Sequence, residues 1–347
     1  MNKPVTTPSP TAFCGIDVSA SSLAVALIEP DHPVAQREFA NSSSGHKALI
    51  VWLGKRKVMV RVSLEATGIY SLDLALALHA TTHIEVAVLN PKLVNRFAQT
   101  LARSQNDVSA ALVLAEYSRR MPFAAWVAPS CKGLQLRGLT RHIDSLVAQQ
   151  TRELNRLHAL EGSRTAPRAV VRDIKSGLAS LARRIVKMRR AAREMIVDDA
   201  ELKERFRLLT TMPGIGEISA IQLLAETVLL APGLTVRQWV AHSGLDPAHH
   251  DSGTSVHKRP HISRAGNRHL RRALFMPTLS AVRCDPHIKI YYQALQARHK
   301  TKLQALMAVA RKLLHAVYGI FKTRTTYDGN KLFPEIKIMP ELQSASR

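Results

Sequence analysis

The chain has 347 residues, of which 46% are apolar and 22% are charged, and its net charge is +23. This length predicts two or three domains, and the apolar content excludes a mainly disordered chain. No apolar run approaches the roughly 18–20 residues that cross a bilayer, and residues 1–13 lack the apolar core of a signal peptide. The cysteines are isolated and odd in number, which argues against a disulfide framework or a cysteine zinc site and fits a reducing cytoplasm; they are Cys14, Cys131 and Cys284.

The first part of the chain alternates short apolar runs with amphipathic stretches after a Pro/Thr/Ser-rich tail at residues 1–12. Three strands in succession are expected first, followed by alternating helices and strands, which indicates an α/β layer fold with a mixed sheet. The expected strands are residues 12–17, 23–27, 34–39, 58–64 and 84–89, and the expected helices are residues 45–53, 70–79, 93–102 and 107–120.

The middle of the chain carries two apolar stripes at helical spacing, separated by a break at residues 162–167. This pattern predicts two long amphipathic helices that form an antiparallel hairpin or coiled coil. Its exposed face is rich in arginine, so the hairpin is expected to serve oligomerisation, nucleic-acid binding or both. From residue 208 onward the chain is expected to be mostly helical, with Gly/Pro breaks.

The positive charge is unevenly distributed. Residues 1–131 carry +3, residues 132–212 carry +9 and residues 213–347 carry +11. Residues 258–324 contain fifteen basic residues and a single acid. A solvated basic face is the ordinary explanation of a short charge run, but this density favours a polyanionic partner, with nucleic acid leading. An anionic membrane fits less well, because no stretch pairs this charge with a continuous apolar helix face.

Three acids occupy positions at which α/β folds commonly carry functional residues, namely the ends of strands and the start of a helix. Asp17 and Glu65 end predicted strands, and Asp107 opens a predicted helix. Because the carboxyl ends of neighbouring strands face one crevice, acids from distant positions can meet there. Converging carboxylates with little else to pair them suit Mg²⁺ or Mn²⁺ bound together with substrate phosphates. A surface cap or salt bridge is the alternative for each acid taken singly.

Residues 208–225 read as a helix, a Pro-Gly-Ile-Gly turn and a second apolar helix. This is the pattern of a helix-hairpin-helix, in which Gly214 and Gly216 let the backbone approach a phosphate at a helix N-terminus. The alternative is a plain helix–glycine turn packed in a core.

Ser252 precedes Gly253 in a polar turn, with His249, His250 and Asp251 nearby as possible bases. A serine becomes a nucleophile only when its proton is accepted or its target is polarised, and most Ser-Gly pairs are simply turns. A zinc site among the six histidines of residues 242–269 is disfavoured, because no matching cysteine or acid set accompanies them. The residues that follow are expected to line one helix face that contacts phosphates: Arg264, Asn267, Arg268, Arg271 and Arg272.

Taken together, these motifs resemble the DEDD-type transposases of the insertion-sequence-110 family, relatives of the Piv invertase and understood as bridge-RNA-guided recombinases. The resemblance covers about residues 12–330. It rests on the ordered segments GIDVS, LEATGIY, NPKLVNRFAQ, NDVSAALVLAEY, WVAP, MPGIGEISA, GLDPAHHDSGTS, SRAGNRHLRRAL and KLLHAVYGIFK.

The resemblance implies a RuvC-like N-terminal domain of the RNase H fold, whose acid tetrad binds divalent metal. Asp17, Glu65 and Asp107 match three of the acids, but Ala110 occupies the fourth position. Either another group completes the site, or the chain is an inactivated variant, natural or engineered. An engineered change is favoured, because the residues around Ala110 keep the family pattern.

The C-terminal part resembles the family's transposase domain, which implies that Ser252 is the nucleophile that joins covalently to DNA. The resemblance also implies composite sites in a synaptic tetramer, assembled through the helical hairpin. The expected divisions are a tail (1–12), a RuvC-like domain (13–128), a helical hairpin (129–207), a helical transposase domain with a helix-hairpin-helix-like element (208–330) and a second tail (331–347).

The predicted function is therefore RNA-guided recombination of an insertion sequence in the bacterial cytoplasm, near the nucleoid. The expected partners are double-stranded target and donor DNA, a structured noncoding guide RNA and further copies of the chain in a dimer or tetramer, but no membrane. Two alternatives remain: a RuvC-type nuclease that uses metal-activated water without a covalent intermediate, and a nucleic-acid-binding protein that has lost catalysis through Ala110.

Overall fold

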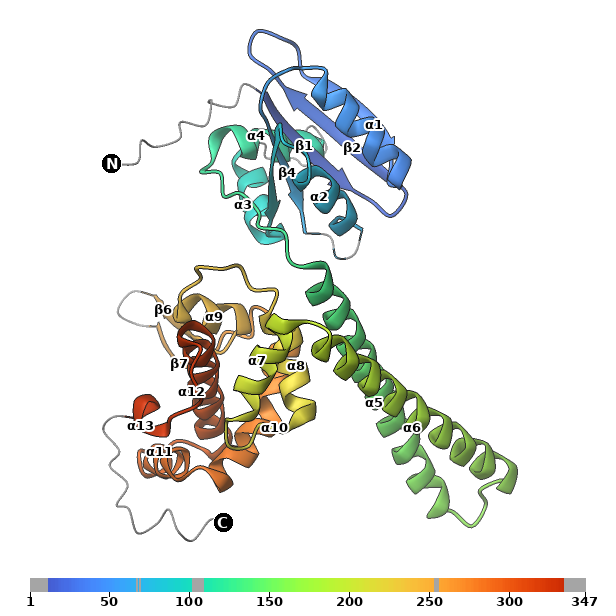
Figure 1. The fold of residues 1–347 in the computed structure, drawn as a ribbon, viewed down its shortest axis with the longest axis vertical. Helices are drawn as coiled ribbons and strands as arrows, with labels where there is room; N and C mark the ends of the chain where they lie inside the picture. Colours follow the sequence, from blue (N-terminus) through green and yellow to red (C-terminus); the bar gives the residue numbers. More distant parts are fainter. Residues whose placement is uncertain (1–11, 67, 69, 102–108, 253–255, 334–347) are drawn as a thin grey trace. The chain divides into compact units, whose positions relative to one another are not determined.

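The computed structural model describes residues 12–333 except 67, 69, 102–108 and 253–255 (Figure 1). The chain forms two compact units, Met1–Ala128 and Pro129–Arg347. Within the described ranges, no helix combines the length and the apolar character that a membrane span requires.

The first unit is built on a five-stranded mixed sheet in the order β3-β2-β1-β4-β5. The first three strands form an antiparallel meander, whereas β4 and β5 run parallel to β1. The mixed α/β architecture expected from the sequence is confirmed, with all five predicted strands present. They are β1 (Ala12–Val18), β2 (Ser22–Ile28), β3 (Ala35–Ala40), β4 (Val60–Glu65) and β5 (Ile84–Leu89).

Helices cover both faces of this sheet. One face packs against α1 (Ser43–Gly54) and α2 (Leu72–His79), and its core includes Ile16 and Leu64. The other face packs against α4 (Ala110–Arg120), which itself contacts α3 (Pro91–Leu101). Because side chains alternate along a strand, every second residue of β1 and β4 points towards α4. This alternation decides where the acids at the ends of the strands point.

Gly15 is the point of closest approach between β1 and α4. A Cβ atom on Gly15 would overlap the carbonyl oxygen of Ala111 and the amide nitrogen of Ala115. The helix backbone therefore lies directly on β1, and the facing helix positions Ala111 and Ala115 are small and buried.

The Gly15→Ala variant is expected to lose about 1–3 kcal/mol of unfolding free energy, because the added methyl group has to displace backbone in a packed layer. Chemical denaturation of the full chain measures this change. The control is Gly138→Ala, since a Cβ at this exposed helical glycine meets no atom within 4 Å. That control should gain about 0.5–1 kcal/mol. Equal stability of Gly15→Ala and the parent chain would contradict the close approach.

The second unit begins with two long helices that lie side by side, α5 (Cys131–Glu161) and α6 (Arg168–Val197) (Figure 1). Leu136 and Ile143 of α5 and Ala192 and Ile196 of α6 belong to the same buried core as the helices that follow. The near end of the hairpin is thus part of this unit, whereas its far end is mostly exposed.

The rest of the unit is helical apart from one hairpin. Capping boxes at Thr235 and Thr301 start two of the helices, and Gly244 in the left-handed conformation ends one of them. The helices are α7 (Ala200–Thr210), α8 (Glu217–Thr227), α9 (Val236–Ser243), α10 (Arg268–Cys284), α11 (Pro286–Ala297), α12 (Lys302–Thr323) and α13 (Gly329–Leu332). The antiparallel hairpin of β6 (Pro247–Ser252) and β7 (Val256–Ile262) was not predicted from the sequence.

Candidate catalytic and nucleic-acid-binding sites

Asp17 and Glu65 lie at the carboxyl ends of two adjacent parallel strands. The β1–β4 register pairs Ile16 with Leu64, so the two acids follow at equivalent positions. Ile16 and Leu64 point into the core under α1 and α2, and the residues after them therefore point to the opposite face, where α4 packs. The sheet thus brings together two acids that are far apart in the sequence.

The electrostatics of Glu65 reflect the neighbouring acid. Partial burial raises the pKa of Glu65, and the negative charge of Asp17 raises it further. Two neighbouring carboxylates without a counter-charge are unfavourable, and a divalent cation with oxygen ligands relieves their repulsion. The donor set of Asp17 and Glu65 therefore fits Mg²⁺ or Mn²⁺. In the part of the chain that the structure describes, no group of three or more candidate ligands gathers; the third expected acid, Asp107, lies outside it.

Ala110 is the first residue of α4, and its side chain is exposed. The Ser109 side chain caps this helix by accepting a hydrogen bond from the amide of Leu112. Because Ala111 rests on Gly15, the start of α4 lies next to the sheet edge that carries Asp17. An acid at position 110 would therefore extend the Asp17–Glu65 pair, whereas a methyl group contributes no ligand.

Asn41 organises the loops at this edge and was missed by the sequence analysis. Its side-chain Nδ2 donates to the carbonyl oxygens of Ser19 at 2.7 Å and Tyr70 at 3.2 Å, and its Oδ1 accepts from His46 Nε2 at 2.8 Å. Asn41 thus connects the turn after β1 with the segment after β4. The sequence offers no signal for this role, because it depends on three loops meeting in space.

Ser252 is the last residue of β6 and pairs with Val256 in the final register of the hairpin. Residues 253–255 and the side chains of residues 249–260 lie outside the described residues. The backbone places Ser252 at the end of strand β6, and the polar turn expected from Ser252 onward falls on residues outside the description. His249, His250 and Asp251 have described backbone positions in β6, but the orientations of their side chains lie outside the description.

The base of this hairpin is held by tight contacts. Ser263 donates its hydroxyl to Asp246 at 2.6 Å and its amide to the Asp246 carbonyl at 2.8 Å. Gly266 has a φ of 131°, and a Cβ there would overlap the carbonyl oxygen of His242. Residues 244–247 and 263–266 therefore pack against each other at the base of the hairpin whose strand β6 carries Ser252.

The two glycines of the predicted helix-hairpin-helix have different environments. Gly214 has a φ of 87°, and its Cβ position lies 2.5 Å from the amide nitrogen of Ala281 in α10. Gly214 therefore allows the turn to pack on α10. Gly216 is exposed, precedes α8 and has no atom within 4 Å of its Cβ position. Among the described residues, no side chain caps α8, so its first amide groups can face a ligand.

The expectation that five polar residues line one helix face is wrong. Helix α10 begins only at Arg268, and Asn267 is its N-cap, accepting from the amides of His269 and Leu270. Arg264 lies before the helix with a φ of 54°. The helix starts late because Asn267 is a strong capping residue and Gly266 requires a backbone conformation outside the helix.

Asn267 and Arg271 make internal contacts. The Asn267 amide donates to Glu226 Oε2 at 2.6 Å, and Arg271 Nη1 donates to the Ser243 carbonyl at 2.7 Å. Arg264, Arg268 and Arg272 are exposed. Asn267 and Arg271 therefore stabilise the local structure, while the three exposed arginines are available to a ligand.

Glu226 is the buried centre of a polar network that the sequence did not reveal. It is 5% exposed and accepts from Arg141 Nε at 2.8 Å and from Arg141 Nη2 at 2.9 Å, besides the bond from Asn267. Burial acts to raise the pKa of Glu226, but the hydrogen bonds from Arg141 and Asn267 outweigh it and hold the pKa below the usual value. The network joins α5, α8 and the start of α10.

A groove in the second unit collects several of the predicted residues. It encloses about 830 Å³, and we call it the α8–α10 groove. Arg264, Arg271 and Arg272 lie along it together with the start of α8. The described residues that line it are Ile143, Asp144, Val147, Arg189, Ile218, Ser219, Gln222, Ile262, Arg264, Arg271, Arg272, Ala273, Phe275, Met276 and Met307. The fold thus brings the helix-hairpin-helix-like turn and the arginine cluster to one surface.

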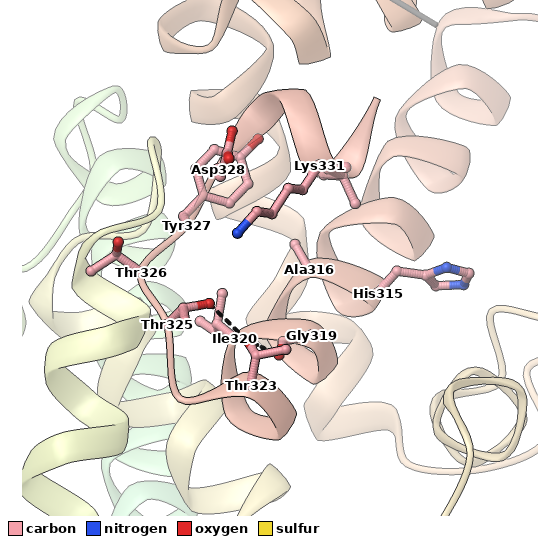
Figure 2. Close-up of a pocket in the computed structure, with 11 residues that line it drawn as sticks. His315, Ala316, Gly319, Ile320, Thr323, Thr325, Thr326, Tyr327, Asp328 and Lys331 are labelled. Atoms are coloured by element: carbon pink, nitrogen blue, oxygen red, sulfur yellow. Dashed lines mark hydrogen bonds between the residues drawn. The ribbon is translucent and has the colours of Figure 1, made fainter. Parts of the chain in front are cut away.

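A smaller hollow of about 220 Å³ lies between the end of α12 and α13 (Figure 2). Lys331 extends across it, the hydroxyls of Thr323 and Thr325 are 2.7 Å apart, and the ring of His315 points away. None of the residues singled out in the sequence lines this hollow. It therefore adds nothing to the predicted chemistry.

Models of known protein families match parts of both units. A family model described as "Transposase" matches residues 14–160, and a model described as "Transposase IS116/IS110/IS902 family" matches residues 206–293. The first match includes Asp17 and Glu65, and the second includes Gly214, Ser252 and the parts of the α8–α10 groove that α8 and α10 supply. The class that these matches define is a DNA transposase or recombinase, which is an enzyme.

The relatives agree with this class. The chain is 27% identical over 325 residues to the pilin gene-inverting protein of Moraxella bovis, covering 91% of this chain and 97% of that protein. It is also 33% identical over 151 residues to an uncharacterized protein of insertion element IS110 from Streptomyces coelicolor, covering 44% of this chain and 37% of that protein. The chain belongs to the insertion-sequence-110 family of transposases.

Proposed function

We propose that this chain is an RNA-guided recombinase that moves an insertion sequence by cutting and rejoining DNA strands. The observation that supports the catalytic part is that Asp17 and Glu65 follow the paired residues Ile16 and Leu64 at one sheet edge, where the charge of Asp17 helps to raise the pKa of Glu65. In this proposal Asp17, Glu65 and Asp107 hold Mg²⁺ or Mn²⁺. Held there, such a cation would supply a positive charge that orients the scissile phosphate and offsets the negative charge developing on it.

Ser252 acts as the nucleophile. Its hydroxyl loses a proton to a neighbouring base, its oxygen forms a bond to phosphorus, and the bond between phosphorus and the deoxyribose oxygen breaks. The released oxygen takes up a proton and leaves as a free strand end. The serine–phosphate bond conserves the energy of the broken bond, so a second strand end can reverse the step and rejoin the DNA.

The strong charge of the second unit supports the choice of partners. Residues 132–347 carry +20, from +9 and +11 in their two parts, whereas residues 1–131 carry +3. A structured guide RNA and the two DNA duplexes are polyanions that this surface attracts, and base pairing of the RNA then selects the sequence. The active form in this proposal is a homo-oligomer, a dimer or tetramer.

Two other functions have an observation in their favour. The acid pair alone would serve a RuvC-type nuclease, which uses metal-activated water and leaves no covalent adduct. The alanine at position 110 favours a nucleic-acid-binding protein that has lost catalysis. Adduct formation separates the first from our proposal, and metal-dependent cleavage separates the second.

The guide RNA is tested by sequencing the RNA that co-purifies with the full chain from its native host. We expect one discrete structured species encoded in the DNA that flanks the gene, because specific recognition selects a single partner from the cellular pool. Total RNA from the same cells is the reference for enrichment. A heterogeneous mixture that follows the composition of total RNA would refute guidance and indicate charge-driven binding.

A further inference from the structure

The α8–α10 groove has a mixed chemical character. Arg189, Arg264 and Arg272 supply positive charge along its walls. Its apolar residues are nevertheless unusually accessible, since Ile218 is 46% exposed, Phe275 38% and Met276 63%. Large apolar side chains that stay exposed together indicate a surface that is covered by a ligand.

Two groups of the protein in the groove lack partners of their own. The Nε atom of Arg189 is buried and has no hydrogen-bond partner among the described residues. The start of α8 has no side-chain cap in the same part of the chain, and Ile218 and Ser219 of its first turn line the groove. A buried donor without a partner is unfavourable, and the amides at the exposed start of α8 are open to solvent, so an acceptor-rich ligand is favoured here.

The groove is suited to an anion. Asp144 is the one acid among the described lining residues, and its carboxylate already accepts a hydrogen bond from Gln222 at 2.7 Å. The other charged lining residues are the four arginines Arg189, Arg264, Arg271 and Arg272. Phosphate groups match both these arginines and the open amides of α8.

Charge alone would suit the backbone of a duplex, whose bases are stacked and paired inside. The exposed apolar side chains need a partner with accessible aromatic faces, which unpaired bases supply. We propose that the α8–α10 groove binds a single-stranded segment of nucleic acid, with phosphates on Arg264, Arg272 and the start of α8 and with bases against Phe275 and Met276. This rests on the proposed function in taking nucleic acid as the partner.

The position of the groove gives this strand a role. Ile262 and Arg264, at the end of β7, line the groove, and Ser252 lies at the other end of the same hairpin. Seven residues of β7 span about 20 Å at a rise of about 3.3 Å per residue. A strand held in the groove therefore lies a few nucleotides from the nucleophile, so unpaired DNA or RNA can be presented next to the point of cleavage.

The test measures binding of labelled 12-nucleotide oligomers to the full chain by fluorescence anisotropy, with single-stranded DNA, single-stranded RNA and the matching DNA duplex as separate arms. Phe275→Ala should weaken single-strand binding about 5- to 150-fold, because a base–aromatic contact contributes about 1–3 kcal/mol. Met276→Ala should also weaken it, because an apolar contact with a base is lost. Duplex binding should stay unchanged. Comparison of the DNA and RNA arms shows which kind of strand the groove prefers.

Controls separate this effect from loss of folding and of charge. Leu303→Ala removes an apolar side chain of α12 that is 61% exposed and lies outside the groove, so it should leave all three arms unchanged. Phe275→Leu keeps apolar volume without the ring and should weaken single-strand binding as Phe275→Ala does, with an unchanged melting temperature. Arg264→Gln and Arg272→Gln should each lower the salt dependence of single-strand binding by about one unit of slope.

Photocrosslinking gives a readout that needs no variant. A single strand with 5-iodouracil should crosslink to peptides within residues 262–276 of the parent chain. Crosslinks only elsewhere, or equal losses of single-strand and duplex binding in the Phe275 and Met276 variants, would overturn the proposal. The proposal is also overturned if the Phe275 and Met276 variants bind single strands as the parent chain does but form an oligomer of different mass. The groove would then be a contact between protein chains. None of these readouts needs adduct formation or a specific guide RNA. The single-strand proposal can therefore be refuted while the proposed function stands, and the proposed function can be refuted while single-strand binding in the groove is observed.

Discussion

Replacing Ser252 with alanine is expected to abolish the covalent DNA–protein adduct. The variant lacks the only oxygen that can form the serine–phosphate bond in the proposed reaction, so the loss should be complete within detection. Binding of RNA and DNA should persist, because the substitution removes one hydroxyl at the end of β6 and leaves the arginines of the α8–α10 groove unchanged. The variant therefore separates chemistry from binding.

The measurement incubates protein, guide RNA, target DNA and Mg²⁺ and detects labelled DNA that migrates with denatured protein. Ser255→Ala removes a hydroxyl three residues further along the chain and should keep the adduct. If adducts survive in Ser252→Ala, the serine role is wrong. Strand cleavage without any adduct would instead support hydrolysis by a RuvC-type nuclease. Both variants are also made in the Ala110→Asp background, so the test is decisive even if the parent chain cleaves slowly.

Ala110→Asp is expected to raise the rate of strand cleavage about 10–100-fold at low Mg²⁺. Removing a group that supports a metal site lowers metal affinity or activity by about this factor, so adding a missing ligand should have an effect of similar size. The new carboxylate would stand at the start of α4, next to the edge that carries Asp17 and Glu65. The position is exposed and at a helix N-terminus, where a negative charge is favourable, so folding should not suffer.

Cleavage rates across a Mg²⁺ titration measure this effect, with Ala110→Asn as the control of similar size and no charge. The aspartate variant should reach half-maximal rate at lower Mg²⁺, whereas the asparagine variant should resemble the parent. Asp17→Asn in the Ala110→Asp background should remove the gain, because the two acids act on the same cation. Equal rates for alanine and aspartate would show that a fourth acid is dispensable in this chain.

The sequence was sufficient to predict the position of a residue in the fold wherever that position depends on its immediate neighbours in the chain. Short apolar runs located the strands that carry Asp17 and Glu65 at or next to their last residues, and parallel strands bring such ends to one edge of the sheet. The arginines of residues 264–272 are close together in the sequence, but their arrangement in space was not predicted. A helical repeat was assumed through Arg264 and Asn267, whereas Asn267 caps α10 and Gly266 forces a turn.

The remaining features depend on contacts between distant segments. Gly214 was assigned to phosphate contact from its motif, but its backbone packs on Ala281 of α10, some 67 residues later. Glu226 joins Arg141 and Asn267, but the sequence did not mark Arg141, and it suggested a phosphate contact for Asn267. Asn41 likewise acts through loops after two other strands.

The sequence by itself determined the family, the basic second unit and the residue types available for chemistry, because motifs and charge are properties of the chain order. Only the tertiary structure decided which of those residues share a surface. It directed Asp17 and Glu65 to one face and set Ala110 at the start of the helix beside them. It also gathered Arg264, Arg272 and the start of α8 around exposed Phe275. The reason is physical: such neighbourhoods arise when strands and helices pack, and packing joins segments whose spacing along the chain carries no trace of it.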